Sequence, residues 1–243
     1  MCGRFVSASP PDQIAAYFDA TPSESLLAPS YNVAPTNDIY AVVEGPDGKR
    51  RLEAFHWGLV PVWAKDLKTG LKMINARAES VATSNAYKRA FRQQRCIIPA
   101  DGFFEWQARP ERRRKQPYYI HRLDGEPLAF AGLWETWRDK SAGPDAPWLH
   151  SCTIITTAAN DTMTPVHNRM PVILPPTAWS EWLSPDNHDM AQLGGLLVPA
   201  PNKLLTMHPV STDVNNVREK DAHLIEEVDP SEPGDPEQPT LGS

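Results

Sequence analysis

Prolines are spread through most of the chain and limit how long any helix or strand can be. There are 25 of them among 243 residues. Proline has no backbone N–H and a fixed φ, so it interrupts helices and strands, and we expect short elements. Eight tryptophans and a hydrophobic content of 41% still allow these short elements to pack around a substantial core.

Strand-like segments dominate the middle of the sequence. Residues 38–43 and 50–58 flank an Asp-Gly turn and are predicted to form a hairpin. Five more strand-like runs follow, and another comes late in the chain: residues 95–100, 102–107, 116–123, 127–137, 151–159 and 204–211.

Helical signals are short and lie at the edges of this strand-rich region. Ser9 is the expected N-cap of a helix over residues 10–18, which has prolines in its first turn. Residues 76–94 predict one or two short helices, and residues 177–183 and 189–197 predict two more. Because helices and strands do not alternate regularly, the pattern predicts an α+β fold with a strongly curved sheet in a single domain.

Charge is distributed unevenly along the chain, whose net charge is −6. Residues 226–243 hold six acidic residues and no basic one, so the rest of the chain is neutral overall. We expect a domain over residues 1–228 and a disordered, acidic, Pro-rich tail over residues 229–243. The densest basic run, residues 109–115, holds five cations in seven residues. Such a run is either a solvated loop or a contact surface for phosphates.

The cysteines favour a reducing compartment. Cys2, Cys96 and Cys152 are odd in number and lack CxxC spacing, which argues against a disulfide framework and a zinc ribbon. No apolar stretch is long enough for a membrane span, and the N-terminus lacks the pattern of a secretory signal. We therefore expect a cytoplasmic protein with no membrane association.

The second residue, Cys2, directly follows Met1. Removal of Met1 would leave a thiol and a free primary amine two carbons apart on one residue. This pair condenses with an aldehyde to close a five-membered thiazolidine ring, which an internal cysteine cannot do. The alternative is that Cys2 has no special chemistry. Arg4 lies two residues further on, and the two form a polar island ahead of an apolar segment.

Three further polar islands interrupt apolar or strand-like segments. Asn75 and Arg77 follow an apolar run, Glu105 stands between two aromatic residues, and His167 and Arg169 precede a strand. Each has a structural alternative. Asn75 could be a turn or cap residue, both arginines could pair with carboxylates, and a lone histidine is more often a structural hydrogen-bonding group than a base.

Glu105 has two possible environments. Side chains alternate along a strand, so Phe103 and Glu105 share one side while Phe104 and Trp106 share the other. Among aromatics the carboxylate would be desolvated, which raises a carboxyl pKa toward values useful for proton transfer. The alternative is the exposed face of an edge strand.

Two tryptophans flank Pro61. Trp57 is in an apolar context and is expected in the core, whereas Trp63 precedes a polar loop. If exposed, Trp63 could stack on the bases of a single-stranded nucleic acid. The alternative is ordinary packing.

Nine short segments occur along the chain in a specific order: "MCGRF", "YNVAPT", "HWGLVPVWA", "INARAES", "IIPADGFFEW", "QPYYI", "IITTAAN", "VHNRMPVIL" and "HPVSTDVNNV". Together they resemble the SOS response-associated peptidase (SRAP) family, whose members cross-link to abasic sites in DNA. The resemblance extends from Met1 to about residue 228 and includes neither residues 109–115 nor the tail. Ala64 stands where some family members have a second tryptophan.

The resemblance implies a curved, barrel-like mixed β-sheet core with short flanking helices around a DNA-binding cleft. It implies a sensor of abasic sites in single-stranded DNA that forms a thiazolidine cross-link through Cys2 after Met1 is removed, protecting the site during the DNA damage response. A monomer is expected, nucleoid-associated if the source is bacterial. The implied enzymatic activities are lyase-type and self-processing peptidase activities.

The family's site residues carry over to matching positions. Glu105 is expected to shuttle protons during sugar opening and dehydration, Asn75 to orient the N-terminus or the sugar, and His167 to assist proton transfer. No metal or other cofactor is expected. Six residues are expected at the DNA: Arg4, Asn32, Trp63, Arg77, Thr156 and Arg169.

Three alternatives remain. N-terminal-nucleophile hydrolases such as glutamine amidotransferases also begin with Met-Cys-Gly, although "PADGFFEW" and "VHNRMP" are not expected in them. A single-stranded DNA-binding protein could carry Cys2 incidentally. A peptidase could use Cys2, Glu105 and His167 to cleave after Met1.

Overall fold

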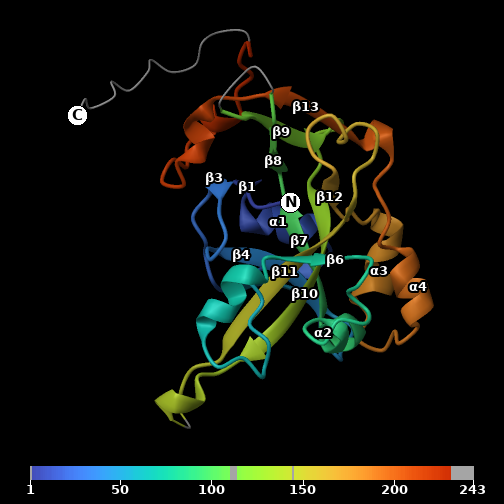
Figure 1. Ribbon diagram of the computed structural model, residues 1–243. Helices are drawn as coiled ribbons and strands as arrows, with labels where there is room; N and C mark the ends of the chain where they lie inside the picture. The colour runs from blue at the N-terminus through green and yellow to red at the C-terminus, as the bar shows by residue number, and fades with distance from the viewer. Residues whose placement is uncertain (1, 110–113, 144, 231–243) are drawn as a thin grey trace.

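Five strands of the computed structural model close into a barrel (Figure 1). The structure describes residues 2–109, 114–143 and 145–230. The barrel strands are β4 (Asp38–Glu44), β5 (Arg50–Trp57), β7 (Arg95–Ala100), β10 (Leu128–Trp137) and β11 (Leu149–Ala158). They are antiparallel in the order β5-β4-β7-β10-β11, and β11 then pairs in parallel with β5. The prediction of an α+β fold with a barrel-like mixed sheet is therefore confirmed.

Short strands extend the barrel sheet at the ends of β11 and β5. β12 (Arg169–Pro171) pairs antiparallel with β11, and β6 (Asn75–Arg77) pairs with β11 in parallel. β2 (Ala20–Thr21) runs parallel to β5. β11 therefore brings together β6 and β12, which carry or adjoin two of the four polar islands.

A second, antiparallel sheet continues from the barrel through Asp101, which separates β7 from β8 (Figure 1). Its strand order is β13-β9-β8-β1-β3, so β8 has a neighbour on each side. The bounds of its strands are β1 (Phe5–Ser7), β3 (Ser30–Val33), β8 (Gly102–Gln107), β9 (Gln116–Arg122) and β13 (Leu205–Pro209).

The helices are short, as the prolines predict. The α-helices are α1 (Pro11–Tyr17), α2 (Lys88–Gln93), α3 (Trp179–Leu183) and α4 (Met190–Gly195). The 3-10 helices are η1 (Leu67–Lys72), η2 (Lys140–Ala142), η3 (Pro176–Ala178), η4 (Asn202–Leu204), η5 (Thr212–Asn215) and η6 (Ala222–Ile225).

Two helix predictions need correction. Pro10, not Ser9, is the N-cap of α1, because the Ser9 hydroxyl donates a hydrogen bond to Asp101 instead. The one or two short helices predicted over residues 76–94 correspond to one helix, α2, but the start of this segment is not helical and belongs to β6. Pairing of β6 with β11 supplies backbone hydrogen bonds that the local sequence does not predict.

The apolar core has two main parts. One cluster includes Phe18, Phe91 and Trp182 and lies between barrel strands and α1 to α4. The other joins barrel residues such as Trp57 to β1 and β8, and it includes Cys2. The start of the chain is therefore packed into the core, where Phe5 contacts Trp57 with ring centroids 5.1 Å apart.

Two predictions fall partly or mostly outside the described residues. These are the basic run, of which residues 110–113 are not described, and the tail, of which residues 231–243 are not described. Within the described ranges, no helix is long and apolar enough to cross a membrane. The same ranges contain no group of three or more His, Cys, Asp or Glu side chains placed to hold a metal ion.

Candidate functional site

Cys2 is completely buried and is held by the neighbouring strand β6. The Asn75 side chain donates a hydrogen bond from Nδ2 to the Cys2 carbonyl oxygen at 2.9 Å. The Tyr87 hydroxyl donates to the Asn75 carbonyl oxygen at 3.2 Å. Burial raises the pKa of Tyr87 to about 12, so this hydroxyl keeps its proton at neutral pH. Asn75 is thus fixed on both sides beside Cys2.

The Cys2 thiol is strongly biased toward its neutral form. Burial raises the thiol pKa well above its usual range, and the negative charge of Glu105 raises it further. At neutral pH the sulfur therefore carries its proton, and a group that accepts the proton is needed before the sulfur can act as a nucleophile.

Glu105 lies near this thiol and is almost completely buried, with 3% of its surface exposed. Its strand β8 is flanked by β1 and β9, and Glu105 pairs with Tyr118 of β9. On the same face, Phe103 belongs to the core cluster that contains Cys2. The edge-strand alternative is wrong, because β8 has neighbours on both sides. Cys2, Asn75 and Glu105 therefore converge from three different parts of the chain.

Arg4 directly precedes β1 and is held in place by hydrogen bonds to other parts of the chain. Its Nη1 donates to Asn32 Oδ1 and to the Val214 carbonyl oxygen, both at 2.7 Å. Its guanidinium carbon lies 5.8 Å from the centre of the Trp106 ring, a cation–π contact. Asn32 is completely buried and donates from Nδ2 to the carbonyls of Val214 (3.2 Å) and Asn216 (3.0 Å). Asn32 thus faces the protein, and its contact with a ligand would be through Arg4.

His167 lies just before β12 and is partly exposed. The backbone N–H of Arg169 donates to His167 Nδ1 at 2.9 Å. A nitrogen that accepts a hydrogen bond has no proton of its own, so neutral His167 carries its proton on Nε2. Nε2 is then a hydrogen-bond donor in the neutral ring.

Thr156 and Arg169 form a buried contact next to His167. Thr156 is completely buried, and its carbonyl oxygen accepts from Arg169 Nη2 at 2.6 Å and from the Ala78 N–H at 2.9 Å. Glu79 binds the guanidinium of Arg169 with both carboxylate oxygens. Thr156 therefore contacts Arg169 and its side chain does not reach the surface, and its expected place at the DNA stays a prediction.

Two predicted DNA contacts lie on the surface. Trp63 has 61% of its surface exposed, and Arg77 is exposed at the end of β6. The Trp63 loop is tied to the barrel, since Trp137 Nε1 donates to the Ala64 carbonyl oxygen at 2.9 Å. Trp57, in contrast, is completely buried, as predicted.

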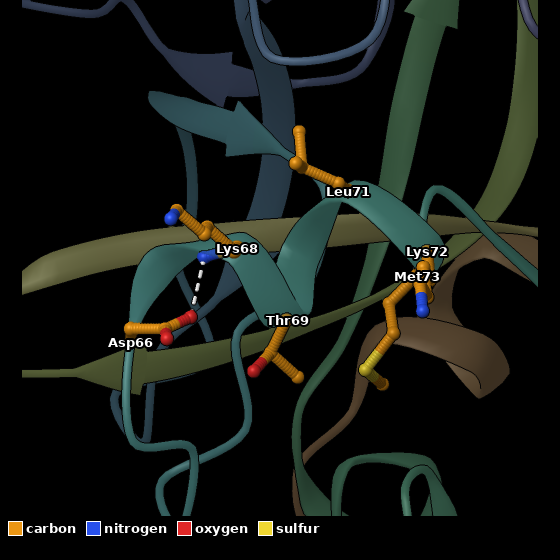
Figure 2. Close-up of a pocket in the computed structure, with 6 residues that line it drawn as sticks. All are labelled: Asp66, Lys68, Thr69, Leu71, Lys72 and Met73. Atoms are coloured by element: carbon orange, nitrogen blue, oxygen red, sulfur yellow. Dashed lines mark hydrogen bonds between the residues drawn. The ribbon is translucent and has the colours of Figure 1, made fainter.

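Two surface pockets lie beside η1. One, of about 540 Å³, is lined by the residues shown in Figure 2, where the Asp66 carboxylate accepts from the Lys68 N–H at 2.9 Å. The other, of about 500 Å³, lies between η1 and the β10–β11 connection and is lined in part by Trp148. Neither of these two pockets is lined by Cys2 or Glu105, which are both buried.

The family comparison covers this cluster and most of the fold. The family model described as "SOS response associated peptidase (SRAP)" matches residues 1–217. The chain belongs to the SRAP family. The family membership that the nine segments indicated is therefore confirmed.

Curated relatives match between 78% and 94% of this chain. The abasic site processing protein YoaM of Bacillus subtilis is 42% identical over 93% of this chain and 98% of its own length. The abasic site processing protein YedK of Escherichia coli is 33% identical over 94% of this chain and 100% of its own length. The abasic site processing protein HMCES of Xenopus tropicalis is 32% identical over 78% of this chain and 63% of its own length.

Solved structures show the same fold. A Bacteroides thetaiotaomicron protein superposes with a TM-score of 0.82 at 24% identity, covering 93% of this chain and all of its own. A Bordetella bronchiseptica protein superposes with a TM-score of 0.73 at 26% identity, covering 86% of this chain and all of its own.

Several site residues of this SRAP protein were not predicted from sequence. Tyr87 holds Asn75 through a hydroxyl group, and Glu79 holds Arg169. Glu79 stands within the "INARAES" segment, which could have drawn attention to it. Tyr87 has no local signal, because its role depends on how α2 packs beside β6.

The raised pKa of Cys2 gives a testable prediction. In the native protein, Cys2 should alkylate with iodoacetamide at least about tenfold more slowly than free cysteine at pH 7, because each unit of pKa removes tenfold of the thiolate. The rate should continue to rise with pH beyond the range in which an ordinary cysteine titrates. Peptide mass spectrometry measures it, with the urea-unfolded protein as the control. Equal rates in native and unfolded protein would contradict the buried thiol.

Proposed function

We propose that this protein senses abasic sites in single-stranded DNA and bonds covalently to them through Cys2. The observation that supports this proposal most strongly is that Cys2, Asn75 and Glu105 lie together, with Cys2 and Glu105 buried. The three residues were singled out from separate segments of the sequence. The names of the curated relatives support abasic-site processing as the general activity.

The bond-forming steps follow from the two groups of Cys2. Removal of Met1 frees an α-amine whose pKa is about 8, so a useful fraction is neutral at cellular pH. The amine nitrogen attacks the aldehyde carbon of the ring-opened sugar, and loss of one water gives an imine. The sulfur then bonds to the imine carbon, the thiol loses its proton, and the nitrogen gains one. The product is a thiazolidine.

The neighbouring side chains fit these steps. Asn75 Nδ2 holds the Cys2 carbonyl, while Asn75 Oδ1 is buried and has no hydrogen-bond partner among residues 2–109, 114–143 and 145–230, which the structure describes. A buried acceptor without a partner is costly, and the freed Cys2 amine would supply a donor beside it. Glu105 would accept the thiol proton as the sulfur attacks and would pass protons during sugar opening and dehydration. His167 would donate from Nε2 to a sugar oxygen.

DNA would lie along the surface that carries Arg77 and Trp63. Arg77 would contact the sugar–phosphate backbone, which positions a strand without reading its sequence, and Trp63 would stack on a base. Arg4 and Arg169 would add positive charge. Asn32 and Thr156, both buried, would hold these two arginines in place.

The proposal is tested with a fluorescently labelled single strand containing one abasic site. A band that survives heat and denaturing electrophoresis should form with this strand and not with an intact strand of the same sequence. Absence of the band from correctly processed protein would contradict the proposal. Ammonia release from glutamine, with no adduct, would instead support the amidotransferase alternative.

The peptidase alternative concerns Met1 itself. Self-cleavage by Cys2, Glu105 and His167 would expose the same amine, so it is compatible with the cross-link. Lyase action on the bound sugar is a further possible outcome and would appear as a shorter labelled DNA fragment on the same gel.

The surface contact gives a second prediction. Arg77→Ala should weaken binding to all single strands about equally and reduce the slope of log affinity against log salt by about one. Lys49→Ala is the matched control. It removes an exposed cation at the β4–β5 turn, which lies at the opposite end of β5 from Trp57. Fluorescence anisotropy at several salt concentrations measures both. Equal slopes in the wild type and Arg77→Ala would remove Arg77 from the DNA surface.

A further inference from the structure

The carboxylate of Glu79 binds the guanidinium of Arg169 with both of its oxygens. We propose that Glu79 occupies the phosphate-binding edge of Arg169 and that a phosphate of the bound strand displaces it. This inference rests on the proposed function, since it concerns the same DNA surface. It assigns to Glu79 a role in setting the affinity for single-stranded DNA.

The contact between Glu79 and Arg169 has the geometry with which arginine binds oxyanions. Arg169 Nη1 donates to Glu79 Oε1 at 2.5 Å, and Nη2 donates to Oε2 at 3.0 Å. Such a two-bond contact matches carboxylate and phosphate equally well. The edge formed by the two terminal nitrogens of Arg169 is therefore already occupied by an anion of this chain.

The other contact of Arg169 would persist after displacement. Its Nη2 also donates to the Thr156 carbonyl oxygen at 2.6 Å, and Thr156 is completely buried on β11. The Glu79 side chain is 55% exposed and lies just beyond the end of β6. Thr156 thus fixes the guanidinium from inside, while Glu79 contacts it from solvent and can rotate away.

Glu79 also interacts with a second predicted DNA contact. The hydrogen bonds from Arg169 hold the pKa of the Glu79 carboxyl below its usual range, and the positive charges of Arg169 and Arg77 lower it further. The carboxylate is therefore ionised at neutral pH and lies close to two arginines assigned to the DNA surface. Its negative charge offsets theirs in the free protein.

Displacement has a measurable consequence. A phosphate must break the Glu79–Arg169 pair before it binds, and it must approach a negative charge. An ion pair with one solvent-exposed partner is weak, so removing the Glu79 charge should raise the affinity about two- to fivefold. The gain should be the same for intact and abasic strands, because both carry the same phosphates.

The experiment compares wild type, Glu79→Gln and Glu79→Ala by fluorescence anisotropy with intact single strands and with strands whose abasic site is reduced, so that it has no aldehyde to bond with Cys2. Glu126→Gln is the control, because it makes the same change of charge at an exposed residue between β9 and β10. Both Glu79 variants should bind about two- to fivefold more tightly than Glu126→Gln. In an Arg169→Ala background, Glu79→Gln should give a clearly smaller gain, because only the charge of Arg77 then remains near the carboxylate.

The outcomes separate this inference from the proposed function. If the wild type forms the covalent adduct but the Glu79 variants bind no better than the control, Glu79 does not compete with phosphate and the inference is wrong. A weaker affinity would show that Glu79 braces Arg169 for DNA, which also contradicts it. A gain of equal size in the Arg169→Ala background would assign the effect to general charge and contradict the inference. If the wild type binds no single strand, the proposed function itself fails.

Discussion

Glu105→Gln should slow formation of the covalent adduct by about 10²–10⁴-fold, the range typical of general acid–base catalysis. Glutamine keeps the shape and volume of glutamate but cannot accept a proton from the Cys2 thiol. Because Glu105 is buried within β8 and not at the DNA surface, the affinity for single strands should stay close to wild type. Single-turnover kinetics with an abasic strand measures the rate.

A second buried carboxylate provides the control for Glu105. Glu135 on β10 is also 3% exposed, but it pairs with Arg89 at 2.7 Å. Glu135→Gln should lower the melting temperature and leave the rate unchanged. An adduct rate of Glu105→Gln equal to wild type would remove Glu105 from the mechanism, and a rate that falls only in step with stability would make it a structural residue.

Cys2→Ala should abolish the heat-stable adduct formed without borohydride. The variant still has an α-amine after Met1 is removed, so an imine can form and borohydride should trap it. It lacks the sulfur that closes the ring. Cys152→Ala, a change at another completely buried cysteine of the same core cluster, should retain the adduct. Denaturing electrophoresis with and without borohydride measures both products.

The contradicting results for Cys2 are specific. A borohydride-independent adduct of Cys2→Ala as stable as that of the wild type would show that the thiol does not close the link. An added residue before Cys2 blocks the primary amine, and we expect neither product from that variant. A full yield from it would exclude the amine as the nucleophile.

Most strands of the fold were predictable from the sequence, because they carry their own local signal. β4 and β5 flank a turn, and β7 to β11 have strand-like composition. Closure of the barrel was not visible in this way. It depends on the parallel pairing of β5 with β11, and pairing between strands so far apart leaves no local pattern. β6 was missed because it is a three-residue strand that exists by pairing with β11.

The sequence predicted those site residues whose chemical type stands out in its local context. It did not predict the features of the site that depend on three-dimensional packing. Cys2, Asn75 and Glu105 were singled out as residue types in unusual contexts, and the fold brings them together. The environment of Glu105 was left open, since a sequence does not say whether a strand is at an edge. The roles of Asn32 and Thr156 as supports for arginines were missed because burial is set by the three-dimensional packing.

The central claim is that both groups of Cys2 bond to the abasic sugar, and intact mass spectrometry tests it most directly. The free protein should have the mass of the chain that begins at Cys2. After incubation with an abasic single strand, the adduct should have the summed mass of protein and DNA less one water. Borohydride should leave that mass unchanged, because a thiazolidine has no imine to reduce. A gain of two hydrogens, or an adduct on protein that retains Met1, would contradict the claim.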